Sequence, residues 1–493
     1  MVALAWAVLP AMPALVAGML VGSRFTDLYP SAWGMQVMAE AWPLVPLSTD
    51  RLGAPGSVGF YYSSPIHGWL GAPLTLAAGP ALAYNLTLLA ARWATVFCTF
   101  GWLRAEGRGT TAALAGSLLY GASPFFHGYA AEGIVEGTDG WTLPLWAWSV
   151  ARNRPMAAIG AFALCVVSSW YLGMVACGVA VLLGFQRRLA WTSLAGGILL
   201  AAPAFYGFAS AFGGNTALPE AVRLAMSAKL AIAAPHWSSP PNPFAINTFV
   251  GATAALLALP SVRKQPILAL LAGACFLLST GRGLWWELPL FSLVRFPYRW
   301  HAGTLFALAG LVALTVDALI AGAPTTGKRR WVSVAAGFVP WFEGLAFSPI
   351  SPLLPGATTE LPAIYREVRG PILLELPGPV ALPPGAPNAS RPRARFVLWA
   401  QATHGARSPW TLDFNGVSRD QDAPWLDSFA SWDPLLHRPQ LAPGVNAARA
   451  AGVRQILLHQ DGYGDRADAL EHALVAAGAV LTHSEPGHRL FAL

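Results

Sequence analysis

Charged residues are scarce in this chain. Asp, Glu, Lys and Arg together make up 11% of the 493 residues, 55% are hydrophobic, and the mean hydropathy is +0.48. A soluble domain carries roughly 25% charged residues, so this composition excludes an ordinary soluble protein. The few Lys and Arg are spread among loops, which also excludes a nucleic-acid-binding surface and a nucleic acid partner.

Cysteine is rare as well. The four cysteines are Cys98, Cys165, Cys177 and Cys275, and all of them lie in apolar stretches. A disulfide framework is therefore not expected. No basic residue precedes the first apolar stretch and no convincing cleavage site follows it, which indicates a retained helix rather than a signal peptide.

Hydrophobic segments fill residues 1–347. A bilayer is crossed by about 20 apolar residues, or by fewer where neighbouring helices shelter the ends. The predicted spans are 2–22, 81–103, 111–126, 140–151, 156–169, 171–186, 189–212, 244–260, 265–281, 299–322 and 331–347. Residues 65–80 are apolar but contain Gly71 and Pro73, which favours a re-entrant or interfacial segment.

The loops between these segments alternate in charge. Short basic loops stay in the cytoplasm, and they hold Arg104, Arg108, Arg152, Arg154, Arg187, Arg188, Arg263, Lys264 and Lys328 to Arg330. The same rule on basic loops predicts two helices rather than one over residues 156–186. We therefore predict a multi-pass protein of the cell (inner) membrane with a cytoplasmic N-terminus and an extracytoplasmic C-terminal domain. A reporter fused after Leu493 that is active only in the cytoplasm would contradict this topology.

The composition changes near residue 348, where Pro, Gly, Arg and Asp become frequent. Short apolar runs predict strands at 371–376, 395–400, 453–459, 479–483 and 490–493, and two further stretches predict helices at 359–368 and 464–477. Alternating strands and helices indicate a small α/β domain over 348–493. The expected fold class is thus an α-helical polytopic membrane protein over 1–347, with about eleven spans, plus this small domain.

Asp27 is the first candidate functional residue. It follows the first apolar segment, and the apolar residues around Trp33 predict a helix lying in the membrane interface. A carboxylate at that position could act as a general base towards an acceptor hydroxyl. The alternatives are a helix cap and an ion pair with Arg24.

The second candidate is the acidic loop 127–139, which contains no Lys or Arg. It holds His127, Glu132, Glu136 and Asp139, and His67 could be brought near by the fold. Glu132 and Glu136 share one face if the loop is helical. Such a group could hold a divalent cation, Mg or Mn, against a phosphate. The alternative is a solvated loop that is acidic because it lies outside.

The third candidate is the pair Arg295 and Arg299, which flanks Pro297 on the predicted external side. Two arginines there run against the positive-inside trend. Arginine binds phosphate oxygens through its planar fork, so a lipid-linked phosphate is a natural partner. The alternative is ordinary snorkelling to headgroups.

Several segments together carry a family resemblance. Asp27 in the first external loop, SSPIHGWLGAPL, LAGSLLYGASPFF, WTLPLWAWSVAR and VRFPYRW resemble the polytopic GT-C-type glycosyltransferases, which include protein O-mannosyltransferases and aminoarabinose transferases. The resemblance implies an external active site, a polyprenyl-phosphate sugar donor, an acidic base in the first external loop and often a divalent metal. By position Asp27 matches the base, and Glu132, Glu136 and Asp139 match acidic positions of the second loop. Unlike many members, this chain has no DxD at Asp27 and no WWD-type signature.

The first functional hypothesis is therefore a membrane glycosyltransferase of the cell envelope. It would move a hexosyl or pentosyl group from a polyprenyl-phosphate lipid to an extracytoplasmic glycan, lipid or protein. Asp27 would be the base, Arg295, Arg299 and His67 would bind substrate, and the loop acids would bind metal. The alternatives are a lipid or polysaccharide transporter, which tends to place ionisable groups at the bilayer midplane, and a non-catalytic scaffold.

Overall fold

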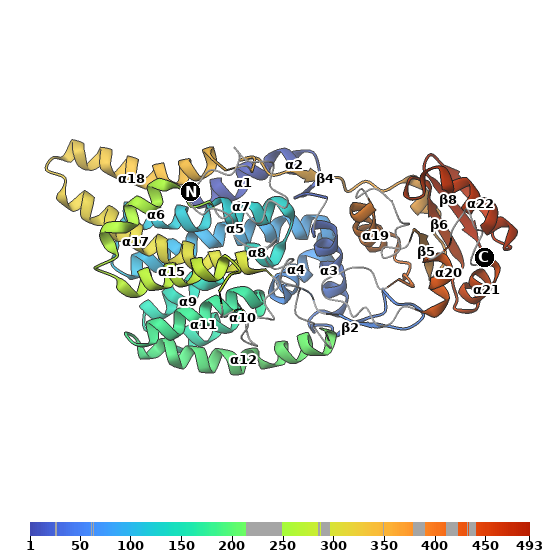
Figure 1. The fold of residues 1–493 in the computed structure, drawn as a ribbon, viewed down its shortest axis with the longest axis horizontal. Coiled ribbons are helices and arrows are strands. Elements are labelled where there is room, and N and C mark those ends of the chain that lie inside the picture. The colour runs from blue at the N-terminus through green and yellow to red at the C-terminus, as the bar shows by residue number, and fades with distance from the viewer. Residues whose placement is uncertain are drawn as a thin grey trace.

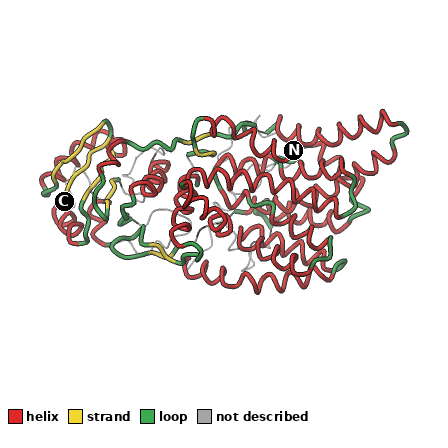
Figure 2. Tube along the Cα trace, turned by 180° about the vertical axis from the view of Figure 1, so that it is seen from behind, coloured by secondary structure: helices red, strands yellow, loops and turns green. Residues whose placement is uncertain are grey.

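The computed structural model has two parts along its length (Figure 1), a large helical bundle and a smaller C-terminal part that contains a sheet. It describes residues 1–24, 27–60, 62, 64–212, 249–283, 286, 296–348, 350–377, 390–410, 423–430, 432 and 440–493. The one four-stranded sheet of the described residues lies at the C-terminal end of the molecule (Figure 2). This arrangement confirms the predicted fold class, whereas the domain boundary at residue 347 stays a prediction.

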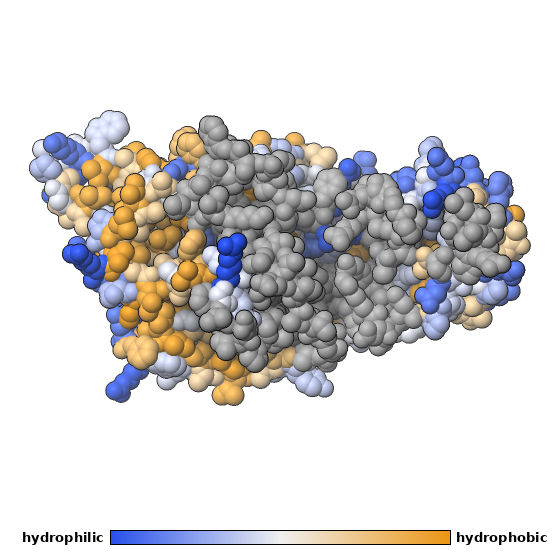
Figure 3. All heavy atoms as spheres, viewed as in Figure 1, coloured by the Kyte–Doolittle hydropathy of each residue, from blue (hydrophilic) through white to orange (hydrophobic). Residues whose placement is uncertain are grey.

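The described residues of the bundle are mostly helical. Its described helices are α1 (Val2–Val8), α2 (Met12–Val16), α3 (Leu28–Ala41), α4 (Pro65–Ala78), α5 (Pro80–Ala105), α6 (Thr110–Gly121), α7 (Pro124–Glu132), α8 (Val135–Thr138), α9 (Thr142–Ala151), α10 (Pro155–Ser168), α11 (Trp170–Gly184), α12 (Arg188–Phe212), α14 (Ala252–Ala258), α15 (Pro266–Ser279), α17 (His301–Gly322) and α18 (Thr326–Ala346). In the described residues, Pro80–Ala105, Arg188–Gly207 and Pro297–Gly322 are long and apolar enough to cross a membrane. Hydrophobic residues cover much of the visible surface of the bundle (Figure 3).

The first predicted span is shorter than expected. Helix α2 ends at Val16, and Leu20–Val21 form strand β1, which pairs antiparallel with β4 (Gly356–Ala357). Pro10 and Pro13 lie at the starts of successive helical turns, and Pro disrupts the interior of a long helix. The prediction of one helix over 2–22 is therefore wrong.

The predicted division of 156–186 agrees with the structure, because this stretch forms two helices, α10 and α11, which are divided at the extended residue Ser169. Residues 65–80, in contrast, contain the regular helix α4, so Gly71 and Pro73 do not break the segment. Its re-entrant or interfacial position stays a prediction.

Helix α3 forms where a helix was predicted, but its apolar side chains face protein. Tyr29, Trp33 and Met38 are all buried, and α3 packs against α4, α5 and α19 (Ser390–His404). The prediction that these apolar side chains of α3 lie in the membrane interface is therefore wrong. Instead, α3 joins the bundle to the C-terminal part.

The C-terminal sheet has the strand order β5-β6-β8-β7. Strand β5 (Leu373–Leu376) pairs parallel with β6 (Gln455–His459), while β8 (His488–Ala492) pairs antiparallel with both β6 and β7 (Val480–Glu485). These four strands and helix α22 (Ala467–Ala476) confirm the predictions in this region. Two predictions are wrong, because 395–400 lies inside helix α19 and only Ala363–Glu367 of 359–368 forms a short 3-10 helix.

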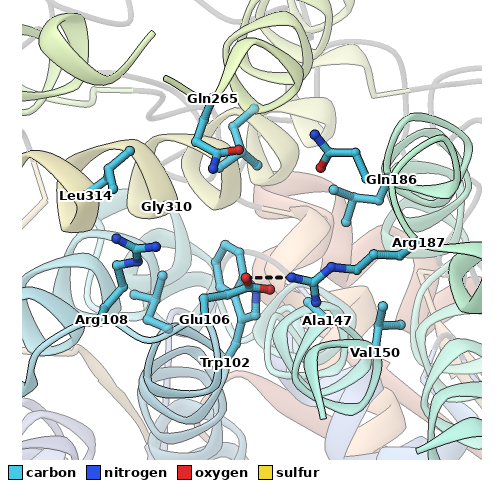
Figure 4. Close-up of a pocket in the computed structure, with 13 residues that line it drawn as sticks. Trp102, Glu106, Arg108, Ala147, Val150, Gln186, Arg187, Gln265, Gly310 and Leu314 are labelled. Atoms are coloured by element: carbon cyan, nitrogen blue, oxygen red, sulfur yellow. Dashed lines mark hydrogen bonds and ion pairs between the residues drawn. The ribbon is translucent and has the colours of Figure 1, made fainter. Parts of the chain in front are cut away.

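Two basic loops meet at one end of the bundle. Arg187 pairs with Glu106 at 2.8 Å and Arg108 with Asp317 at 3.7 Å, which joins the ends of α5, α11 and α17. A cavity of about 100 Å³ lies there, and the Glu106–Arg187 pair is among the residues that line it (Figure 4). The α17–α18 turn lies farthest from the C-terminal part (Figure 1). This clustering is what a single cytoplasmic face requires, and the orientation in the membrane stays a prediction.

Candidate active site

The first loop is fixed to the bundle by hydrogen bonds from α5. The Tyr84 hydroxyl donates to the Val21 carbonyl at 3.1 Å, and the Asn85 side chain accepts from the Val21 amide at 2.9 Å. The Ser23 amide then donates to the carbonyl of Ala131 in α7 at 2.7 Å. The chain that leads to Asp27 is therefore attached directly to the acidic loop.

Glycine permits this close approach. Gly22 has φ of +134°, and a Cβ there would lie 2.7 Å from the Leu28 side chain and 3.0 Å from the Gly133 Cα. The positive φ of Gly22 and the short distances from a Cβ at this position both exclude a larger residue. Gly133 also accepts, through its carbonyl, a hydrogen bond from the Ser31 hydroxyl at 3.2 Å. The first loop and the acidic loop thus form one unit.

Asp27 lies at the start of α3 with its side chain 30% exposed. It makes no side-chain capping hydrogen bond to α3, so the helix-cap alternative is wrong for the described residues. Its Oδ1 atom is 3.2 Å from a guanidinium nitrogen of Arg395 in α19. Asp27 also acts on the acidic loop, because its charge is among those that raise the pKa of Glu136 after the larger effects of burial and Arg299.

The acidic loop is buried rather than solvated. It forms α7 and α8, in which Glu132 is 1% exposed, and it ends at Asp139, which is 2% exposed. Gly133 ends α7 in the left-handed conformation with φ of +70°, so Glu132 and Glu136 do not share one helical face. The predictions of a solvated loop and of a shared face are both wrong.

Asp139 and His67 lie together. The Ser64 hydroxyl donates to Asp139 Oδ2 at 2.5 Å and the Trp141 indole to Oδ1 at 3.2 Å, while His67 Nδ1 is 3.6 Å from Oδ1. His67 is 4% exposed, in the first turn of α4. Burial raises the pKa of Tyr62, and the charges of Tyr84, Asp139 and Glu136 raise it further. This tyrosine therefore lies within electrostatic reach of both acids.

Arg299 pairs with Glu136 inside an aromatic box. Its guanidinium carbon is 4.3 Å from the ring centre of Tyr171, 4.6 Å from Phe296 and 5.9 Å from Tyr129. The residue is only 7% exposed, so snorkelling to headgroups is wrong for Arg299. Arg295 lies outside the described residues.

The three loop acids do not fit a metal site as they are arranged. Across the described ranges, no group of three or more His, Cys, Asp or Glu side chains gathers closely enough to hold a metal ion. Glu136 is already paired with Arg299, and Asp139 accepts hydrogen bonds from Ser64 and Trp141. The reaction proposed for this site therefore gives no role to Mg or Mn.

His127 lies apart from this group, on the side of α7 that contacts α5. Its Nε2 atom is 2.9 Å from the Ser351 carbonyl oxygen, and Arg92 is 3.5 Å from Nδ1. A neutral ring with hydrogen on Nε2 satisfies both contacts. Burial, followed by the charge of Arg92, lowers the pKa of His127 to about 3. His127 is thus a neutral packing residue rather than a ligand for a cation.

Stability should fall in acid because of His127. The unfolded ring binds a proton near pH 6.5 and the folded ring only near pH 3, so the stabilisation is complete above pH 6.5 and is lost as pH falls. Between pH 7 and pH 5 the loss is about 2 kcal/mol. The melting temperature of His127→Gln should therefore fall less over this interval than that of the wild type. His472→Gln, at an exposed position of α22, is the control. An equal fall in His127→Gln and the wild type would contradict the assignment.

Sequence reasoning missed Arg395 and Ser64. Ser64 precedes Pro65 at the start of α4, which is a recognisable helix-start signal, but nothing local connects it with Asp139. Arg395 lies 368 positions from Asp27, in a segment that resembled a strand. Only the fold brings these residues together.

The sequence matches no protein-family model and no curated protein. Solved structures do match. Arabinofuranosyltransferase AftD from mycobacteria superposes with a TM-score of 0.53 at 16% identity, over 99% of this chain and 40% of that one. The chain thus spans less than half the length of that transferase.

Two smaller proteins match as well. ArnT from Cupriavidus metallidurans, bound to undecaprenyl phosphate, gives a TM-score of 0.51 at 12% identity over 99% of this chain and 98% of that one. The oligosaccharyltransferase AglB from Archaeoglobus fulgidus, in complex with an inhibitory peptide and a dolichol-phosphate, gives 0.52 at 11% identity over 96% and 70%. All three are GT-C-type glycosyltransferases, so the chain has the GT-C-type membrane fold.

Proposed function

We propose that this protein is an integral membrane glycosyltransferase that moves a sugar from a polyprenyl-phosphate donor to an extracytoplasmic acceptor. The observation that supports this most directly is the attachment of Asp27, on the first loop of a GT-C-type fold, to a buried acidic loop. The matching ArnT and AglB structures hold undecaprenyl phosphate and a dolichol-phosphate, respectively. The C-terminal part would lie outside the cytoplasm with this site.

In this proposal Asp27 is the general base. Its side chain is 30% exposed, so an acceptor can reach it, whereas Asp139 is only 2% exposed and the Glu136 side chain only 18% exposed. As the acceptor oxygen bonds to the anomeric carbon, its proton passes to the Asp27 carboxylate. The bond from that carbon to the phosphate oxygen breaks, and polyprenyl phosphate leaves with the electron pair.

The other residues position substrate and loops. His67 is buried beside Asp139 and is assigned to substrate binding from that position. Arg299 already has a carboxylate partner, so we assign it to holding the acidic loop rather than to the donor phosphate.

The full chain, purified in lipid nanodiscs, should consume a lipid-linked sugar. Short-chain polyprenyl-phosphate pentoses and hexoses would each be incubated with the protein and a mixture of envelope glycans, and released polyprenyl phosphate would be followed by mass spectrometry. Release from at least one donor, with the sugar recovered on an acceptor, is the expected result. A correctly folded protein that binds and consumes none of the donors would favour the scaffold or transporter alternatives.

A further inference from the structure

We infer that Arg395, in the C-terminal part, is a positioning residue of the proposed active site and holds the carboxylate of Asp27. This inference rests on the proposed function. The two side chains meet at 3.2 Å through Oδ1 of Asp27, and they are 25% and 30% exposed, respectively. The proposed site would then be completed by a residue far beyond the helical bundle.

An exposed ion pair is usually weak, because two long side chains must be ordered to form it. Here the helix that carries Arg395 is fixed independently of the pair. The Trp33 indole of α3 donates to Gln401 Oε1 of α19 at 2.7 Å, and both residues are buried. Gln401 donates in turn to the Arg51 carbonyl at 2.6 Å. These contacts already order the backbone at Arg395, so the ion pair does not have to do so.

Aromatic packing fixes the same helix close to Asp27. The Tyr29 ring, two residues along from Asp27, packs edge-on against Phe396 with centres 5.3 Å apart and stacks with Trp399 at 6.4 Å. The Trp399 indole donates to the Thr359 carbonyl at 3.1 Å. Phe396 is the immediate neighbour of Arg395, so the backbone that carries the guanidinium is fixed close to Asp27.

The charges nearby give Arg395 its role. The charges of Asp27 and Asp139 are among those that raise the pKa of Glu136, after burial and Arg299, so the carboxylates of the first loop and the acidic loop lie within electrostatic reach of Glu136. Arg299 offsets the charge of Glu136, and Arg395 does the same for Asp27. With Oδ1 held by Arg395, Oδ2 is directed to the acceptor hydroxyl. A base held in one orientation gains rate through geometry alone.

The test compares Arg395→Ala, Arg395→Lys and Arg407→Ala in the full chain, with kcat and donor KM measured separately. Arg407 is the matched control, because it lies in the same C-terminal part and pairs with Asp50 at 3.7 Å. Arg395→Ala should lower kcat by about 10- to 100-fold with donor KM within about twofold, since orientation is lost and donor binding is not. Arg395→Lys should recover part of kcat, and Arg407→Ala should match the wild type.

Three results would overturn the inference: an unchanged kcat in Arg395→Ala, a raised kcat, which would make the pair an inhibitory lock, and a change in donor KM alone. A readout independent of activity is the melting temperature of Asp27→Asn, Arg395→Met and the double variant. Non-additive shifts support the pair, whereas additive shifts overturn it. If the wild type transfers no sugar, the proposed function fails, and the melting cycle still decides whether Arg395 holds Asp27.

Discussion

Asp27→Asn should reduce sugar transfer by about 10²- to 10⁴-fold, the range expected when a general base is removed. Asn has nearly the same shape as Asp, but it cannot accept the proton of the acceptor hydroxyl. Donor binding should change little, because the proposed role of Asp27 is towards the acceptor. The measurement is the rate of polyprenyl phosphate release, together with donor affinity for the purified variant.

Asp50→Asn is the matched control for this substitution. Asp50 lies in the same external loop, with its side chain 67% exposed, and it pairs with Arg407. Its loss should leave the rate within about twofold, as for an exposed pair. Equal rates in Asp27→Asn and the wild type would remove Asp27 from the chemistry.

The second large effect is expected on stability. Arg299→Met leaves Glu136 as a buried carboxylate without its partner, and breaking a buried pair in this way costs about 3–5 kcal/mol. Adding Glu136→Leu should restore much of that loss, because neither charge is then buried. Thermal unfolding of the two single variants and the double variant, in the same detergent, measures the coupling.

The control pair for this cycle is Glu106 and Arg187 at the other end of the bundle. Arg187 is 37% exposed, so Arg187→Met should cost about 1 kcal/mol or less. A double variant of Glu136 and Arg299 that is no more stable than the worse single variant would contradict the account. The pair would then act through shape rather than charge.

Charge patterning was the most reliable guide to the architecture. The basic loops that carry Arg108 and Arg187 meet at one end of the bundle, as their sign predicts. Apolar runs in the C-terminal part were also sufficient, since Gln455–His459 forms a mostly buried strand and Val480–Glu485 forms a strand although it is mostly exposed. In both cases the prediction depends only on residues that are close together in the sequence, namely the charges of a short loop or the apolar residues of a short run.

The predictions were wrong where a short segment fits two kinds of secondary structure, or where a contact joins residues far apart in the sequence. The run RFVLWA is apolar over its last residues, and periodicity alone does not separate a short buried strand from a buried helix. It lies in α19 because Phe396, Val397 and Trp399 pack on their neighbours as a helical surface. The predicted partner of Arg295 and Arg299 was a lipid-linked phosphate. In the structure Arg299 instead pairs with Glu136 of the same chain, which no spacing could identify.

The contact between Trp33 and Gln401 has a consequence for biosynthesis. These residues are 368 positions apart, and the Tyr29 hydroxyl donates to the Thr358 carbonyl across 329 positions. Contacts of such long sequence separation form only after the intervening chain has been made, and they order last because the loop they close is long. The membrane helices can thus insert one after another during translation while Asp27 still lacks Arg395. A ribosome-bound chain that has not yet reached residue 395 would therefore hold Asp27 without the residue that is proposed to position it.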